Sequence, residues 1–89
     1  MNPPSPIAVT LYGKPGCHLC DDLRAMLDEL RGEFDFALVE RNIEDDPGNF
    51  ARFRHSIPVL EVAGKSLLYP PHDTVSLRQA LLTAGRSIE

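Results

Sequence analysis

The chain has 89 residues and a formal net charge of −4 at pH 7, with 43% hydrophobic and 25% charged residues. This length supports one small domain with a single core, and the composition is that of a globular domain rather than a disordered one. The acidic balance argues against a nucleic-acid partner, and no apolar run approaches the roughly 18 residues that a membrane span requires.

The first six residues contain three prolines and predict a short extended leader over residues 1–6. They hold neither a basic region nor an apolar stretch, so they do not resemble a secretory signal. A single domain over residues 7–89 and a cytoplasmic location are therefore expected. The two cysteines agree with this location, because they are too few for a disulfide scaffold.

The first half of the domain predicts two strands around a helix. Residues 7–12 are rich in β-branched and aromatic residues, and their near-continuous apolarity favours a central strand covered on both faces. A helix follows over 19–30, with Gly32 as its stop, and a second strand over 34–41. The apolar stripe of the helix consists of Leu19, Leu23, Met26, Leu27 and Leu30.

The second half predicts a short helix, a hairpin and a last helix. Asp46 can cap the short helix, with Pro47 as its first residue and Phe50 and Phe53 on its apolar side. Strands are predicted over 57–62 and 66–69, joined by the turn at 63–65. Asp73 caps the last helix and Gly85 ends it; its apolar positions are Leu77, Ala80, Leu81 and Ala84.

The predicted order is β-α-β-α-β-β-α, which is an α/β architecture. Two early strands separated by a helix form a parallel pair with a right-handed crossover. The late hairpin adds antiparallel strands. The expected result is a mixed four-stranded sheet flanked by helices on its faces.

The residues that carry chemistry are Cys17 and Cys20, at the junction of the first strand with the first helix. Their spacing of three places both sulfur atoms on one side of the first turn, close enough to bridge. At the helix N-terminus, free N–H groups and the helix dipole stabilise a thiolate, which favours Cys17 as the attacking group. Cys20, one turn further, is suited to resolving a mixed disulfide.

Two other interpretations of the cysteine pair stay open: inert core residues, or half of a structural metal site. A zinc site needs four ligands, and the candidates besides the cysteines are His18, His55 and His72, none at a recognisable ligand spacing. A strand–helix junction within a β-α-β pattern favours a redox pair. We therefore expect no bound metal.

The segment from Tyr12 to Cys20, Tyr-Gly-Lys-Pro-Gly-Cys-His-Leu-Cys, together with Ile57-Pro58, resembles a glutaredoxin. More closely, it resembles the small bacterial glutaredoxin-like proteins of the thioredoxin fold that carry a Cys-His-Leu-Cys site, and the likeness covers about residues 7–84. The resemblance implies a thioredoxin-like fold and thiol–disulfide exchange through a Cys17–Cys20 disulfide. It also implies a cis bond before Pro58, which would turn the backbone of Ile57 toward an incoming peptide or glutathione.

The resemblance assigns further binding roles. Lys14 matches a basic residue near the glutathione carboxylate and the thiolate, although a solvated loop lysine explains it equally well. Asp73 matches an acidic residue near the γ-glutamyl amine, and its capping role alone also accounts for it. His18 replaces the usual proline, and its imidazole can stabilise the reduced thiolate. Pro70-Pro71 replaces the usual Gly-Gly and removes two backbone donors, which counts against glutathione bound in the usual mode.

The sequence thus predicts an enzyme that exchanges disulfides in a protein or a small molecule, with glutathione or a dithiol reductase as reductant and no tightly bound cofactor. A monomer is expected, since no exposed apolar stripe is evident. The alternative function is a non-catalytic module in which the same thiols hold zinc or share an iron–sulfur cluster across a dimer. A third option is an interaction domain that the disulfide merely stabilises.

Overall fold

The computed structural model describes residues 6–86, so most of the expected leader and the last three residues of the expected domain lie outside the described residues. The described residues form the predicted order of strands and helices, with one additional 3-10 turn that the sequence analysis did not predict. In chain order the elements are β1 (Ile7–Gly13), α1 (His18–Leu30), β2 (Phe36–Asn42), η1 (Ile43–Asp45), α2 (Pro47–Phe53), β3 (Val59–Val62), β4 (Ser66–Leu68) and α3 (Thr74–Arg86).

The four strands form one mixed sheet in the order β2-β1-β3-β4, which confirms the predicted architecture. β1 is central: it pairs in parallel with β2, from Ile7 opposite Phe36 to Gly13 opposite Asn42. It pairs antiparallel with β3, which in turn forms the antiparallel hairpin with β4. The carboxyl end of β1 therefore lies inside the sheet, and the loop that follows it leads directly to α1.

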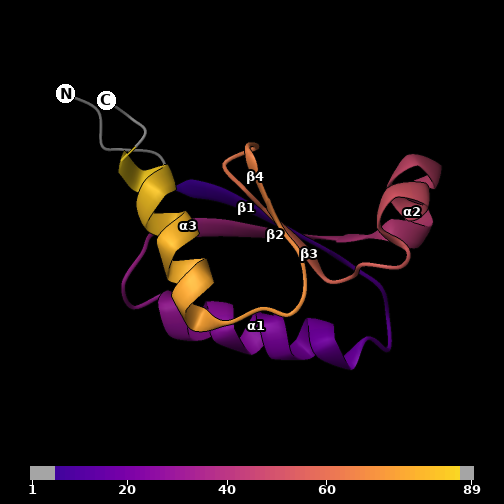
Figure 1. Ribbon diagram of the computed structural model, residues 1–89, viewed down its shortest axis with the longest axis horizontal. Coiled ribbons are helices and arrows are strands. Elements are labelled where there is room, and N and C mark those ends of the chain that lie inside the picture. Colours follow the sequence, from indigo (N-terminus) through magenta and orange to yellow (C-terminus); the bar gives the residue numbers. More distant parts are fainter. Residues whose placement is uncertain (1–5, 87–89) are drawn as a thin grey trace.

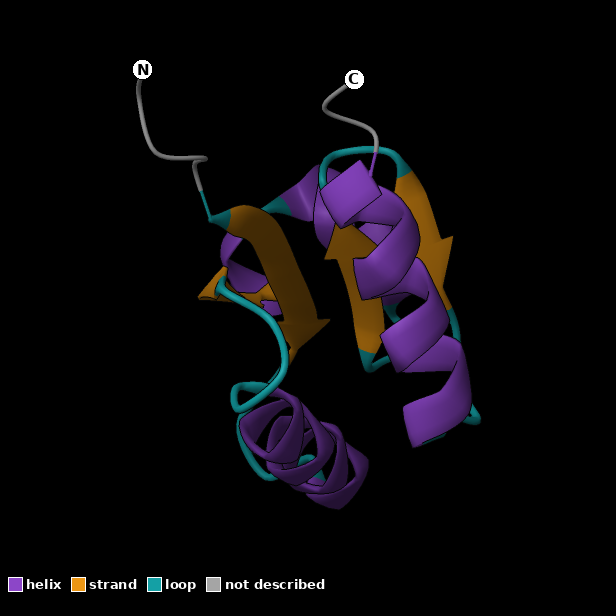
Figure 2. Ribbon diagram, turned by 90° about the vertical axis from the view of Figure 1, so that its left-hand side faces the viewer, coloured by secondary structure: helices purple, strands orange, loops and turns teal. Residues whose placement is uncertain are grey.

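Helices α1 and α3 pack on the same face of the sheet (Figures 1 and 2). Alternate residues of the central strands point to that face, and Val9 lies opposite Val62 while Leu11 lies opposite Leu60. Each such fully buried aliphatic side chain contributes roughly 1.5–3 kcal/mol of transfer free energy. The buried members of this main core are Val9, Leu11, Cys20, Leu23, Leu27, Leu30, Phe36, Leu60, Val62, Leu77 and Leu81.

Helix α2 has a small core of its own and stands at the end of the sheet, apart from α1 and α3 (Figure 1). Phe53 is buried with Ile43 and Val59, and its ring lies 4.8 Å from that of Tyr12. As predicted, Asp46 caps the helix: its Oδ1 accepts the N–H of Gly48 at 2.8 Å. The molecule therefore carries two cores of unequal size.

Three predictions about apolar faces and helix ends are wrong. Leu19 is 54% exposed, because the buried stripe of α1 consists of Cys20, Leu23, Leu27 and Leu30, and Leu19 lies on the flank of that stripe. Phe50 is exposed as well, and the guanidinium of Arg54 lies 5.4 Å from its ring centroid. Gly85 does not end the last helix, since α3 continues to Arg86 and Gly85 is not in the left-handed region that a stop glycine adopts.

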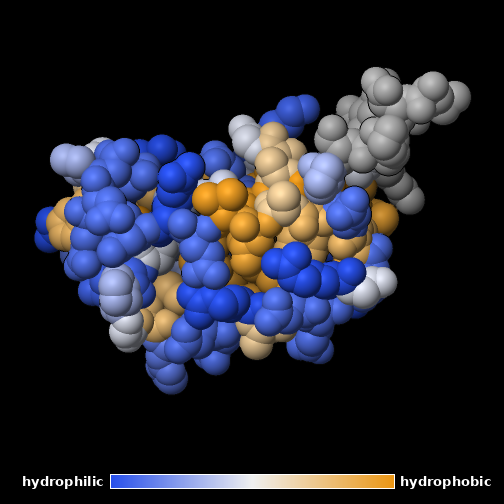
Figure 3. All heavy atoms as spheres, turned by 180° about the vertical axis from the view of Figure 1, so that it is seen from behind, coloured by the Kyte–Doolittle hydropathy of each residue, from blue (hydrophilic) through white to orange (hydrophobic). Residues whose placement is uncertain are grey.

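The molecular surface is mixed. Viewed from behind, apolar side chains gather near the middle of the molecule and polar ones surround them (Figure 3). On the edge strand β2, Val39 is among the large apolar side chains that solvent reaches. Within residues 6–86, no helix has the length and apolarity needed to cross a membrane.

Candidate functional site

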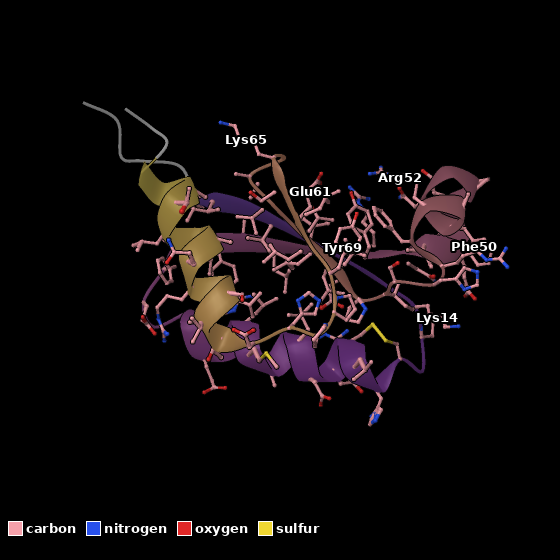
Figure 4. The ribbon with its side chains drawn as sticks, in the orientation of Figure 1. Lys14, Phe50, Arg52, Glu61, Lys65 and Tyr69 are labelled. Carbon is pink, nitrogen blue, oxygen red and sulfur yellow. A yellow bond between two sulfur atoms is a disulfide. The ribbon has the colours of Figure 1, made fainter. Side chains whose placement is uncertain are left out.

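The two cysteines form a disulfide at the start of α1, visible as the bond between two sulfur atoms in Figure 4. Cys17 is the N-cap residue of the helix, and its Sγ accepts the backbone N–H of Cys20 at 3.1 Å. Cys17 directly follows the Lys-Pro-Gly loop that connects the end of β1 to α1. Gly16 has a φ of +78°, a conformation that favours glycine and turns the loop into the helix. One sulfur atom is therefore held where the helix presents its free N–H groups.

The two sulfur atoms differ in access to solvent. Cys17 is partly exposed, whereas Cys20 is 2% exposed and belongs to the main core. The end of β1 closes over Cys20: a Cβ placed on Gly13 would lie 2.6 Å from the Cys20 Sγ. A partner molecule can therefore contact Cys17, whereas Cys20 is shielded from the partner and contacts Cys17. The sequence did not indicate this role of Gly13, because a glycine after a strand is equally typical of an ordinary turn.

The loop before β3 contains the Ile57-Pro58 bond, which is cis, as the resemblance implies. Pro58 is buried, and its carbonyl oxygen lies 2.7 Å from the Nε2 of His72. Because a carbonyl oxygen only accepts, Nε2 carries the hydrogen. His72 thus joins the segment before α3 to the proline loop. The sequence analysis considered this histidine only as a metal ligand, and no spacing rule marks such a contact.

An apolar groove of about 400 Å³ lies beside the first turns of α1. The helix supplies one wall, and Pro58 with the segment before α3 supplies the other. The Pro70-Pro71 bond in that segment is also cis. The lining residues are Leu19, Asp22, Leu23, Met26, Pro58, Pro70, Pro71 and His72.

A second hollow, of about 300 Å³, lies along the ends of β1 and β2 and is polar. Arg24 crosses from α1 to β2, where its Nε and Nη2 donate to the two carboxylate oxygens of Glu40 at 2.9 and 2.7 Å. These hydrogen bonds from Arg24 hold the pKa of Glu40 below its ordinary value. The lining residues are Leu11, Gly13, Lys14, Pro15, Cys20, Arg24, Glu40, Arg41 and Asn42.

The structure separates the predicted binding residues. Lys14 is exposed on the loop at the disulfide end of the molecule and belongs to the polar hollow (Figure 4). Pro58 belongs to the apolar groove, and Ile57 packs against the small core around Phe53. His18 is exposed at the first position of α1. The two hollows share no lining residue.

Asp73 caps α3, as the sequence predicts. Its Oδ1 accepts the backbone N–H of Ser76 at 2.8 Å, and its Oδ2 accepts the Ser76 hydroxyl at 3.2 Å. The backbone hydrogen bond is the main reason why the pKa of Asp73 is below its ordinary value. Both carboxylate oxygens are thus used within the helix cap, and the role toward a ligand stays a prediction.

Among residues 6–86, no three His, Cys, Asp or Glu side chains come together as a group that could hold a metal ion. His18 is exposed at the start of α1. The Nε2 of His72 is hydrogen-bonded to the Pro58 carbonyl oxygen.

Comparison with known proteins agrees with this geometry. Residues 8–82 match the model of the glutaredoxin-like domain family. The structure is similar to that of XcR50 from X. campestris, with 31% identity, 84% of this chain and 96% of that chain covered, and a TM-score of 0.73. It is also similar to Ne2328 from Nitrosomonas europaea, with 26% identity, 91% and 98% coverage, and a TM-score of 0.77.

A more distant likeness establishes the fold. A mutant thioredoxin from Halobacterium salinarum aligns with a TM-score of 0.69 at 14% identity, over 88% of this chain and 74% of that one. The predicted thioredoxin-like fold is confirmed. A search of curated proteins found no match.

Proposed function

This chain belongs to the glutaredoxin-like domain family, and we propose that it is a thiol–disulfide oxidoreductase with Cys17 as nucleophile and Cys20 as resolving thiol. The observation that carries the proposal is the unequal exposure of two bonded sulfur atoms at the start of a helix. A thiolate at Cys17 faces the helix dipole and the N–H of Cys20, which both favour negative charge. A partner disulfide can approach this sulfur.

The reaction has two exchange steps. In the dithiol form, the Cys17 thiolate attacks one sulfur of a partner disulfide, whose S–S bond breaks as a Cys17–partner bond forms. The partner's other sulfur leaves as a thiolate and takes up a proton. Cys20 then loses its proton and attacks the Cys17 Sγ, which forms the internal disulfide and releases the second partner thiol. Two electrons pass from this chain to the partner, and a thiol or dithiol reductant returns them.

The loop before β3 supports the binding step of this proposal. Ile57 lies just before β3 and is not part of the sheet. Within residues 6–86, its N–H and its C=O make no backbone hydrogen bond of a loop, turn or cap. An extended segment of a substrate could pair with these groups as an added strand does. His72 would hold the loop in place through the Pro58 carbonyl.

The reductant and the setting belong to the same proposal. Glutathione or a protein dithiol would restore the reduced pair, and a reducing compartment such as the cytoplasm suits such a cycle. Each chain carries both thiols, so a monomer is sufficient for activity. A reduction potential near about −200 to −230 mV would favour glutathione as reductant, and one near about −270 mV would favour a dithiol protein.

The test uses Cys17→Ser and Cys20→Ser, each reacted in its reduced form with a chromogenic aromatic disulfide. Cys17→Ser should lose the fast reaction, because Cys20 is buried. Cys20→Ser should complete the first step and accumulate a mixed disulfide on Cys17, visible as a mass increase that dithiothreitol removes. Full activity in Cys17→Ser would exclude this mechanism. Stoichiometric metal or visible colour in protein purified without chelator would instead favour the binding module.

A further inference from the structure

The apolar groove beside the disulfide has an exposed apolar wall. Leu19, between the two cysteines in sequence, leaves half of its surface to solvent although it is a large aliphatic residue. Met26 lies two turns further along α1, and Pro58, Pro70 and Pro71 face the helix from the other side. Neither cysteine lines the groove, but Leu19 lies two residues after Cys17, so the groove begins within one helical turn of the sulfur that a partner is joined to.

The charge of the groove is negative. Its only ionisable carboxylate is Asp22, and neither lysine nor arginine lines it. Asp21 precedes this residue but pairs with Arg24, and Asp73 follows His72 but caps α3, so Asp22 is the carboxylate that the groove presents. The ring of His72 uses Nε2 on the Pro58 carbonyl. Pro70 and Pro71 have no N–H to offer. The groove therefore presents one carboxylate and neither lysine nor arginine, which disfavours a carboxylate ligand.

Glutathione is a poor match to this groove. It carries two carboxylates and one ammonium group, and has no large apolar side chain. Three cations, Lys14, Arg24 and Arg41, line the polar hollow, which shares no residue with the groove. An apolar side chain followed by a basic one would instead bury carbon against Leu19 and Met26 and place its charge by Asp22.

We propose that the groove selects protein disulfides in which the attacked cysteine is flanked by an apolar and a basic side chain, in preference to glutathione disulfide. This inference rests on the proposed function, because the groove acts on the exchange at Cys17. The occupant is an extended segment of a partner protein. Its disulfide accepts the two electrons of the Cys17–Cys20 dithiol by the two steps given above, and both partner sulfurs leave as thiols.

The experiment compares three disulfides with the reduced protein at pH 7. One is a symmetric disulfide of a short peptide with Leu and Lys beside its cysteine, the second has Ser and Glu there, and the third is glutathione disulfide. Second-order rate constants are measured by acid quench and alkylation. Each is divided by the rate constant of the same disulfide with dithiothreitol, which removes differences in intrinsic reactivity. The Leu/Lys peptide should react about tenfold faster than the other two.

Two groove variants and one control assign the preference to the groove. Leu19→Ser should lower the rate for the Leu/Lys peptide about tenfold relative to the rate for glutathione disulfide. Asp22→Lys should lower the rate for the Leu/Lys peptide and raise that for the Ser/Glu peptide, and added salt should weaken both effects. Val75→Ser is the matched control, since Val75 is an exposed apolar residue of α3 outside the groove.

The outcomes separate the two proposals. Equal normalised rates for all three disulfides, unaffected by Leu19→Ser, would overturn the groove's selectivity while exchange at Cys17 stands. A faster reaction with glutathione disulfide would overturn it in favour of a small-molecule substrate. Absence of exchange with every disulfide, the chromogenic one included, would overturn the proposed function and this inference together.

Discussion

Replacing Gly13 by alanine tests how tightly the end of β1 closes over the resolving cysteine. The new Cβ would lie 2.6 Å from the Cys20 Sγ and 3.3 Å from Leu11 Cδ2, so the first contact is about 1 Å inside the optimal separation of non-bonded atoms. The sulfur has little room to move, since it is buried and bonded to Cys17. The backbone of Gly13 is not in the left-handed region, so the contact alone opposes alanine.

The expected loss is that of overpacking a core, about 1–3 kcal/mol in the free energy of unfolding. For a domain of this size it corresponds to a fall in melting temperature of roughly 4–20 °C. The measurement is urea and thermal unfolding of the oxidised protein, followed by circular dichroism. Cys20 remains the resolving thiol in this variant, so the mixed disulfide with Cys17 should still be resolved unless the sulfur is displaced.

Gly85→Ala is the matched control, because the chemical change is the same and the surroundings differ. Gly85 lies inside α3, and the nearest atom to its added Cβ is Ile7 Cδ1 at 3.9 Å, an ordinary contact. Alanine there should stabilise the protein by about 0.5–1 kcal/mol through helix propensity. If Gly13→Ala were as stable as the wild type, the strand end would be able to yield, and our account of the buried sulfur would be refuted.

Three further predictions concern α2, α3 and the bridge from α1 to β2. Phe53→Ala removes the largest side chain of the small core and should lower the free energy of unfolding by about 3–5 kcal/mol in urea; a loss below about 1 kcal/mol would contradict the anchoring of α2. Asp73→Ala removes the acceptor for the Ser76 N–H and should lower the melting temperature, and an unchanged value would exclude a stabilising cap. Because Arg24 holds the pKa of Glu40 below its ordinary value of 4.5, the ionised carboxylate stabilises the fold above that pH, and this contribution is lost as pH falls through the lowered pKa. Arg24→Gln should raise the Glu40 pKa in an NMR titration and cost less than about 1 kcal/mol at pH 7; an unmoved pKa would show that the pair does not form in solution.

The order of elements could be predicted because each one leaves a local signal. The strand-forming residues of β1 and the cap at Asp46 are local features, and the structure contains both. Burial alternates along β1, however, so the expected cover on both faces of this strand is wrong. The cysteine spacing was informative for the same reason. Positions 17 and 20 are one helical turn apart, so their closeness follows from the helix alone.

Contacts between distant segments could not be predicted in this way. His72 and the Pro58 carbonyl are 14 residues apart, and Arg24 and Glu40 are 16 residues apart. Nothing in either local pattern specifies how the segments cross. The exposure of Leu19 was missed for a related reason: helical periodicity gives the approximate apolar side of the helix, and only the assembled fold decides which residues at the edge of that side are covered.

The separate small core under α2 has a consequence for how the molecule opens. The small core that anchors α2 has three buried side chains, whereas the main core under α1 and α3 has eleven. A fluctuation that releases α2 exposes little apolar surface, so it requires less free energy than global unfolding. Backbone amides of Phe50 and Phe53 should therefore exchange with deuterium through partial opening, while those of Leu27 and Leu81 exchange only when the whole domain opens.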